Sequence, residues 1–186
     1  MLAFLDFEAS SLAKRSYPIE VAWVFEDGRS ESYLIRPAPD WSDWDPAAEA
    51  IHRIARETIV TQGTPHDVVA DRMIDQLTGH DLLASAPSWD GKWMSALLRA
   101  SGLPRHSLRL RDTDDAERET VSAILSPLVA PAELDRLVSD LLKRAKGASR
   151  GTPAHRALAD AQAEQARWLA VRNAAQDLAM QLRAHG

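Results

Sequence analysis

The pattern of apolar and polar residues predicts a chain that opens with three strands. Residues 1–7 form an almost continuous apolar run, which is typical of a strand buried on both faces in the middle of a sheet. Residues 18–25 and 30–36 are also rich in strand-forming residues. Between them, Asp27-Gly28 is a strong turn signal. The sequence therefore predicts a central strand followed by an antiparallel hairpin.

Helical periodicity dominates the rest of the chain. We predict helices over 47–54, 56–61, 65–78 and 91–100, with short strands at 81–85 and 108–110 between the later ones. Residues 116–185 are predicted to be helical, with breaks near Pro127 and Pro131 and a loop over 147–153. This order predicts one α/β domain over 1–186, with an opening antiparallel hairpin, parallel strands and flanking helices.

Composition narrows the class of protein. A chain of 186 residues with 45% hydrophobic content is long enough for one domain with its own core. The sequence has no cysteine, no basic segment before its first apolar run and no apolar stretch near ~20 residues, so we expect a cytoplasmic protein with no membrane span. The net charge of −5 argues against a protein that coats long nucleic acid by charge alone.

Two carboxylates at the end of the first strand are the first candidate chemistry. Asp6 and Glu8 are two residues apart, so in an extended strand they point to the same face. Two such anions repel unless a proton or a cation lies between them. Hard oxygen ligands favour Mg²⁺ or Mn²⁺. The alternative is a strand end in solvent with both acids hydrated.

Three later residues offer similar chemistry. Asp90 follows a predicted strand at the start of a helix, where an aspartate by itself is most often a helix cap. His155 and Asp160 are five residues apart, which is not the one-turn spacing of a helical pair. They share a face only if His155 lies on the loop that leads into the helix or in its first turn. Each residue alone is more typical of a solvated surface.

Taken together and in this order, these residues resemble the DnaQ-like (DEDDh) 3′–5′ exonucleases of the ribonuclease H-like superfamily. That family includes ribonuclease T, oligoribonuclease and the DNA polymerase proofreading subunit. The matching segments are Leu5-Asp6-Phe7-Glu8 with Leu12, Trp89-Asp90-Gly91-Lys92-Trp93, and His155 to Ala161 with Asp160, and two weaker matches lie at 50–54 and 110–113. The motifs span 1–165, and 166–186 is the end of the last helix.

The resemblance implies a ribonuclease H-like mixed sheet and a metal-dependent enzyme that hydrolyses single-stranded DNA or RNA, short oligonucleotides above all, from the 3′ end. Two divalent cations, Mg²⁺ or Mn²⁺, would be held by Asp6, Glu8, Asp90 and Asp160. His155 would act as the general base, a role that suits imidazole because its unperturbed pKa is ~6.5.

Substrate contacts also follow from the resemblance. Leu12 would lie between the last two bases and Trp93 would stack on the terminal base, although plain core packing is the alternative for both. Lys146 and Arg150 belong to a run of basic residues before the third motif, where they would contact phosphates if the run is more than a solvated face. The other members of this run are Lys143, Arg144 and Arg156.

The sequence departs from the family pattern at four positions. Ala9 and Ser10 replace two threonines, Arg53 replaces a glycine and Ala86 replaces an asparagine. These departures leave two alternatives open: a DnaQ-like nucleic-acid-binding or regulatory module with little turnover, and a hydrolase of dinucleotides or small phosphodiesters. A homodimer is a candidate assembly, since the predicted last helix over 158–182 has apolar surface to spare.

Overall fold

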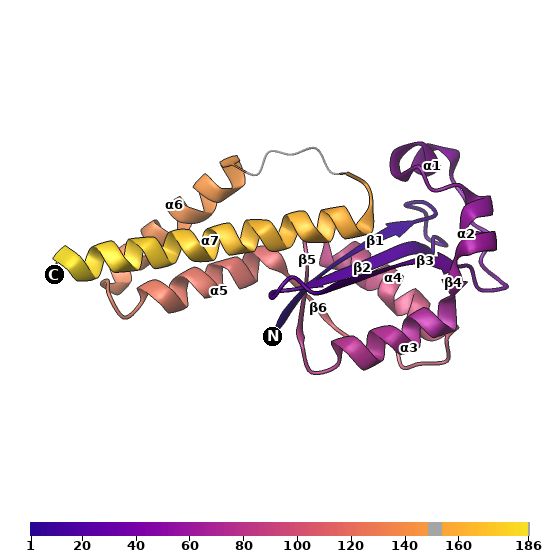
Figure 1. The fold of residues 1–186 in the computed structure, drawn as a ribbon, viewed down its shortest axis with the longest axis horizontal. Helices are drawn as coiled ribbons and strands as arrows, with labels where there is room; N and C mark the ends of the chain where they lie inside the picture. Colours follow the sequence, from indigo (N-terminus) through magenta and orange to yellow (C-terminus); the bar gives the residue numbers. More distant parts are fainter. Residues whose placement is uncertain (149–153, 186) are drawn as a thin grey trace.

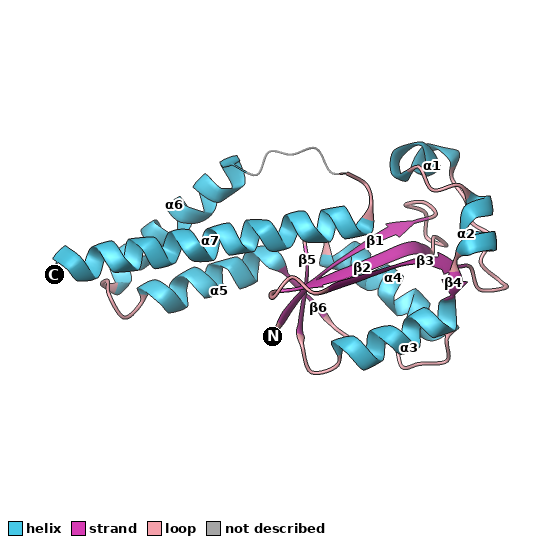
Figure 2. Ribbon diagram, viewed as in Figure 1, coloured by secondary structure: helices cyan, strands magenta, loops and turns pink. Residues whose placement is uncertain are grey.

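A computed structural model of the chain describes residues 1–148 and 154–185. These residues form a six-stranded mixed sheet of order β4-β3-β2-β1-β5-β6, with helices packed on both faces (Figures 1 and 2). The strands are β1 (Leu2–Ala9), β2 (Pro18–Phe25), β3 (Ser30–Arg36), β4 (Thr64–Pro65), β5 (Asp81–Ala84) and β6 (Leu110–Asp112). The helices are α1 (Pro46–His52), α2 (Arg56–Gln62), α3 (His66–Leu77), α4 (Pro87–Ala100), α5 (Thr113–Leu125), α6 (Pro131–Ala148) and α7 (Ala157–His185).

Strand β1 lies in the middle of the sheet, as predicted. It pairs antiparallel with β2 and parallel with β5, and β2 and β3 form the predicted hairpin. Alternate side chains of β1 face opposite layers. Ala3, Leu5 and Phe7 belong to the core shared with α3 and α4, whereas Phe4 packs against Trp168 of α7. The same alternation puts Asp6 and Glu8 on the face that α7 covers.

The C-terminal helices have a second core away from the sheet. Helices α5, α6 and α7 extend beyond the strands as a three-helix unit (Figure 1, salmon to yellow). Its interior contains Val121, Leu125, Val138, Val171 and Ala175. Apolar residues of the last helix, among them Val171, Ala175 and Ala179, are therefore buried against α5 and α6 of the same chain, whereas Met180 is 60% exposed. None of the described helices has the length and apolar content that a membrane span requires.

Several element boundaries differ from the sequence-based predictions. The helix expected at 91–100 begins at Pro87, since proline is well suited to the first helical position. Asp90 therefore lies inside the first turn of α4 and is not its cap. The last strand is β6 at 110–112, not 108–110, because pairing of Leu110 with Leu82 and Asp112 with Ala84 determines its position. The two-residue β4 is too short to leave a hydrophobic pattern, and most of the loop predicted over 147–153 lies outside the described residues.

Arg53, which stands where the family pattern has glycine, adopts a backbone conformation that favours glycine. Arg53 ends α1 with a φ of 58°, in the left-handed region, and its N–H donates to the carbonyl of Glu49 at 2.7 Å. Glycine adopts this conformation without the steric penalty of about 1–2 kcal/mol that other residues incur. Arg53 thus occupies a turn that suits glycine, and its side chain is exposed outside the candidate site described below.

Candidate active site

One cleft of about 460 Å³ collects the five candidate acid and base residues. It lies beside the carboxyl ends of the parallel strands β1 and β5, between α4 and the start of α7. The residues that line it are Asp6, Phe7, Glu8, Leu12, Ser85, Ala86, Trp89, Asp90, Trp93, His155, Asp160, Ala163, Glu164 and Arg167. Segments from both ends of the sequence therefore meet at one site.

Strand β1 supplies Asp6 and Glu8, and its pairing with β2 changes register directly after Glu8. Glu8 lies opposite Glu20, but Ala9 lies opposite Pro18. Such irregularities bend a strand and are common next to active sites. After this point Ser10 turns away from the cleft, where its hydroxyl donates to Asp43 at 2.9 Å. Ala9 and Ser10, which stand where the family pattern has threonines, are therefore buried and do not line the cleft.

Helix α4 places one carboxylate and two tryptophans at the cleft. Asp90 is buried with only 3% of its surface exposed, and Trp93 is 7% exposed. The indole N–H of Trp93 donates to the Ser16 hydroxyl at 3.0 Å, so this ring is part of the core. Trp89, one turn earlier, is 40% exposed. Leu12 is 70% exposed, so Trp89 and Leu12 are the large apolar side chains of the cleft that a ligand can contact.

His155 lies on the short segment that leads into α7, in the left-handed conformation with a φ of 52°. Asp160 holds this segment from the helix side, accepting hydrogen bonds from the N–H groups of Ala154 at 2.9 Å and Arg156 at 3.3 Å. Glu20 of β2 holds it from the sheet side. Its buried carboxylate accepts from the Arg156 guanidinium at 2.7 Å and from the Ala157 N–H at 3.0 Å. Two carboxylates thus fix the turn that carries the imidazole.

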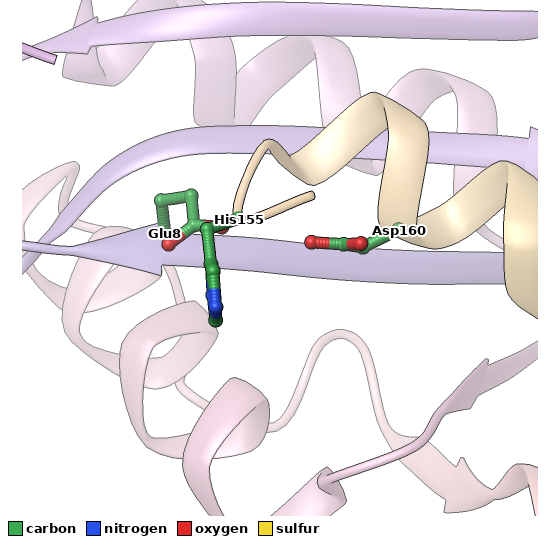
Figure 3. A group of neighbouring side chains, drawn as sticks. All are labelled: Glu8, His155 and Asp160. Carbon is green, nitrogen blue, oxygen red and sulfur yellow. The ribbon is translucent and has the colours of Figure 1, made fainter. Parts of the chain in front are cut away.

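The end of β1 and the start of α7 bring three potential ligands together. A carboxylate oxygen of Glu8, a carboxylate oxygen of Asp160 and a ring nitrogen of His155 all lie within 4.8 Å of one another. Figure 3 shows Glu8 on its strand, Asp160 projecting from α7 and His155 on the segment before that helix. Asp6 and Asp90, the other two predicted ligands, line the same cleft. This set of carboxylates and one imidazole suits a hard or borderline divalent cation.

The electrostatics of the cleft favour the same chemistry. Burial, reinforced by the neighbouring carboxylates of Asp90, Glu8, Asp160 and Glu164, raises the pKa of Asp6 to about 9. Burial and the charge of Asp160 raise the pKa of Glu8 to about 7, and burial raises that of Asp90 to about 7. Carboxyl groups with such values hold protons near neutral pH unless a cation replaces them. The cluster is therefore suited to bind positive charge.

Two ionisable residues of the cleft were missed by sequence reasoning. Glu164 is 7% exposed, accepts a hydrogen bond from the Thr113 hydroxyl, and has a pKa raised by burial to about 7. Arg167 is held by Glu117 at 2.7 Å and Asp114 at 3.2 Å. The spacing of four residues between Asp160 and Glu164 places both on one helix face, and this spacing was the available signal.

Of the two basic residues predicted to contact phosphates, Lys146 does not line this cleft. Lys146 forms an ion pair with Asp114 at 2.5 Å and lines a separate cavity between α5 and α6. Arg150 lies outside the described residues. Its predicted phosphate contact, like those of the other substrate-binding residues, stays a prediction.

Comparison with solved structures identifies the fold. The chain superimposes on the zinc-bound form of Escherichia coli exonuclease I in complex with single-stranded DNA with a TM-score of 0.66, at 19% identity over 93% of this chain and 40% of that one. Exonuclease I from Methylocaldum szegediense gives a TM-score of 0.64 at 19% identity, over 90% of this chain and 40% of that one. The E. coli enzyme with a dA16 oligonucleotide gives 0.64 at 19% identity, over 95% and 42%.

The fold is ribonuclease H-like. The predicted fold class is thus confirmed. This chain spans about two fifths of the length of these exonuclease I chains. No protein-family model and no curated protein matches the sequence.

Proposed function

We propose that the protein is a 3′–5′ exonuclease of the DEDDh type, which hydrolyses the terminal phosphodiester bond of single-stranded DNA or RNA with the help of two divalent cations, Mg²⁺ or Mn²⁺. The observation that carries the proposal is the convergence of five carboxylates and one imidazole in a single cleft. The likeness to exonuclease I structures, two of them with bound single-stranded DNA or oligonucleotide, supports this choice of substrate.

Each group in the cleft has a part in this reaction. Asp6, Glu8, Asp90 and Asp160 would hold the cations, which when bound stabilise the charge on the attacking and departing oxygens. His155 would accept the proton of the attacking water at a ring nitrogen, within the turn fixed by Asp160 and Glu20. Leu12 and Trp89 would hold the terminal nucleoside, because their exposed apolar surfaces border the carboxylates.

A gel time course tests the proposal. Single-stranded DNA and RNA labelled at the 5′ end would be incubated with Mg²⁺ or Mn²⁺ and the wild-type protein. We expect a ladder that shortens from the 3′ end and is abolished by EDTA and by Asp6→Ala. The His155→Ala variant should be slower by about 10²–10⁴, the usual contribution of a general base.

The matched control is His106→Ala, which removes an exposed histidine outside the cleft and should leave the ladder unchanged. Undiminished cleavage by Asp6→Ala, or release of the label in the first product, would contradict the proposal. If neither polymer is cut although Mn²⁺ stabilises the protein, dinucleotides and small phosphodiesters become the substrates to test.

A further inference from the structure

A second, basic groove adjoins the cleft. It has a volume of about 340 Å³ and is lined by Lys14, Arg15, Ser16, Asp40, Trp41, Ser42, Asp43, Ala96 and Arg99. The wall between cleft and groove is one loop. Leu12 lines the cleft, and Lys14, Arg15 and Ser16, only two to four residues later, line the groove.

Helix α4 runs along both hollows. Trp89, Asp90 and Trp93 face the cleft, and Ala96 and Arg99 face the groove. Residues 89, 93, 96 and 99 follow helical spacing on one side of α4 and span about 15 Å at a rise of 1.5 Å per residue. The cleft and the groove therefore lie on the two sides of the loop over 12–16 along the same helix, and a ligand whose end lies beside the carboxylates enters the groove by crossing this loop.

The loop between the two hollows is fixed to this helix. The Lys92 ammonium donates to the Ala13 carbonyl at 2.7 Å and to the Ser16 hydroxyl at 2.9 Å, and it lies 5.0 Å from the centre of the Trp89 ring. Trp93 donates to the same Ser16 hydroxyl at 3.0 Å. The basic side chains beyond Ala13 are thus presented at a defined distance from the exposed Trp89 ring.

The charges of the groove are available to a ligand. Lys14, Arg15 and Arg99 are exposed, and within residues 1–148 and 154–185 none of the three forms an ion pair. Of the two acids present, Asp43 accepts hydrogen bonds from the hydroxyls of Ser10 and Ser11 at 2.9 and 2.6 Å. Within the same described residues, three cations without an ion pair thus line the groove with two carboxylates, one of which already accepts two hydrogen bonds, and the Arg99 guanidinium donates only to the Ser95 carbonyl of its own helix at 3.2 Å. This local excess of positive charge is notable in a chain whose net charge is −5.

We propose that this groove binds the phosphates of a single-stranded nucleic acid on the 5′ side of the nucleotide held in the cleft, through Lys14, Arg15 and Arg99. The inference rests on the proposed function, because that function puts the 3′ end beside the carboxylates. It also specifies the substrate class: a strand of several nucleotides, whose phosphates provide charges that a dinucleotide lacks. Binding should not depend on base sequence, because phosphates carry no sequence information.

Binding measurements test the groove without turnover. The inactive Asp6→Asn protein would be titrated with a 5′-fluorescent single strand of about ten nucleotides, at several salt concentrations, with and without the triple change Lys14→Ala, Arg15→Ala, Arg99→Ala. We expect Kd to rise by at least about tenfold. The slope of log Kd against log salt should fall by about 2, since each phosphate contact on a single strand contributes about 0.7.

The matched control removes three exposed arginines that line neither hollow, with Arg29→Ala, Arg136→Ala and Arg183→Ala, and should keep the original Kd and slope. An unchanged Kd and slope in the groove variant, or no binding of the strand by either protein, would show that the groove does not bind the strand.

Kinetics separate this outcome from failure of the proposed function. With the active site intact, the groove variant should lose its preference for the longer strand over a dinucleotide, measured as the ratio of their kcat/KM values. If the groove variant cuts the longer strand with the wild-type KM and salt dependence, the groove does not bind the substrate, and the exonuclease proposal is unaffected. If the strand binds through the groove but the wild-type protein never cuts it, the exonuclease proposal is wrong and the proposal of a strand-binding groove is supported.

Discussion

Trp89 and Trp93 lie one helical turn apart on α4, with ring centres 5.7 Å apart, but their surroundings differ. The family resemblance singled out Trp93 as the base-stacking ring. In the structure its indole N–H donates to Ser16 inside the core, and only 7% of its surface is exposed. Trp89 is 40% exposed at the edge of the cleft. At the scale of single residues, exposure separates the ring that packs from the ring that a ligand can contact.

Substitution of the two rings should give different results. We expect Trp89→Ala to raise KM for a single strand by about 5- to 150-fold, since stacking on one base contributes about 1–3 kcal/mol. Trp93→Phe loses the hydrogen bond to Ser16, and should lower the free energy of unfolding by about 1 kcal/mol with little effect on KM. Steady-state kinetics and thermal melts of both variants measure these effects. Trp89→Phe keeps an aromatic face and should retain most of the binding, whereas a larger rise in KM for Trp93→Phe would reverse the assignment.

At the scale of the elements, the sequence predicted what hydrophobic periodicity determines and missed what long-range pairing determines. The apolar run over 1–7 correctly predicted the central strand, because a strand covered on both faces needs apolar residues throughout. The position of β6 and the existence of β4 depend on neighbouring strands far away in the sequence. The same holds in the site: local spacing suggested Asp6 and Glu8 and offered a signal for Glu164, four residues after Asp160, but nothing local to Glu20 indicated that it would lie beside the start of α7.

Glu20, which the sequence did not single out, joins β2 to the start of α7 next to the proposed general base. It is 4% exposed, and its carboxylate accepts hydrogen bonds from the Arg156 guanidinium and from the N–H of Ala157, which are the two residues that follow His155. Since Glu20 does not line the cleft, it acts on the reaction by positioning the imidazole. We expect Glu20→Gln to lower kcat by about tenfold with KM unchanged, because small displacements of a catalytic group are costly in rate.

Kinetics of Glu20→Gln, Arg156→Lys and Arg156→Ala test this positioning role. Arg156→Lys keeps the charge and should restore part of the kcat lost in Arg156→Ala, while KM stays constant in all three. A parallel rise in KM, or a loss of activity explained entirely by unfolding at the assay temperature, would contradict the assignment. Glu31→Gln is the matched control, because it removes another glutamate–arginine pair, with Arg72, that lies outside the cleft.

At the scale of the whole molecule, α7 joins two parts of the structure. Its first turns bring Asp160 and Glu164 to the sheet, and its later residues Val171, Ala175 and Ala179 pack against α5 and α6. The helix of 29 residues spans about 44 Å, which allows one element to serve both cores. Much of the apolar surface that suggested a homodimer is buried within the chain, and the homodimer itself stays a prediction.

The protonation of the acidic cluster affects the stability of the whole fold. Asp6 has a pKa of about 9, and Glu8, Asp90 and Glu164 have values of about 7, all raised above those of the unfolded chain. Groups of this kind stabilise the folded state fully below their unfolded pKa values, and this contribution is lost as pH rises through the folded ones. For each proton that the folded protein holds in excess, the free energy of unfolding falls by about 1.4 kcal/mol per pH unit.

In EDTA, the melting temperature should therefore decrease between about pH 5 and pH 9. Mn²⁺ should offset the decrease, because a cation bound only by the folded state at 100 times its Kd stabilises it by about 2.7 kcal/mol. The Mn²⁺ shift should itself grow with pH, since the cation replaces protons on the same oxygens. Asp6→Asn should flatten the pH dependence in EDTA and lose most of the Mn²⁺ shift, whereas Asp75→Asn, on α3 and outside the cleft, should keep both. A melting temperature in EDTA that rises with pH, or an equal Mn²⁺ shift in wild type and Asp6→Asn, would show that the cluster does not bind the cation as an assembled site.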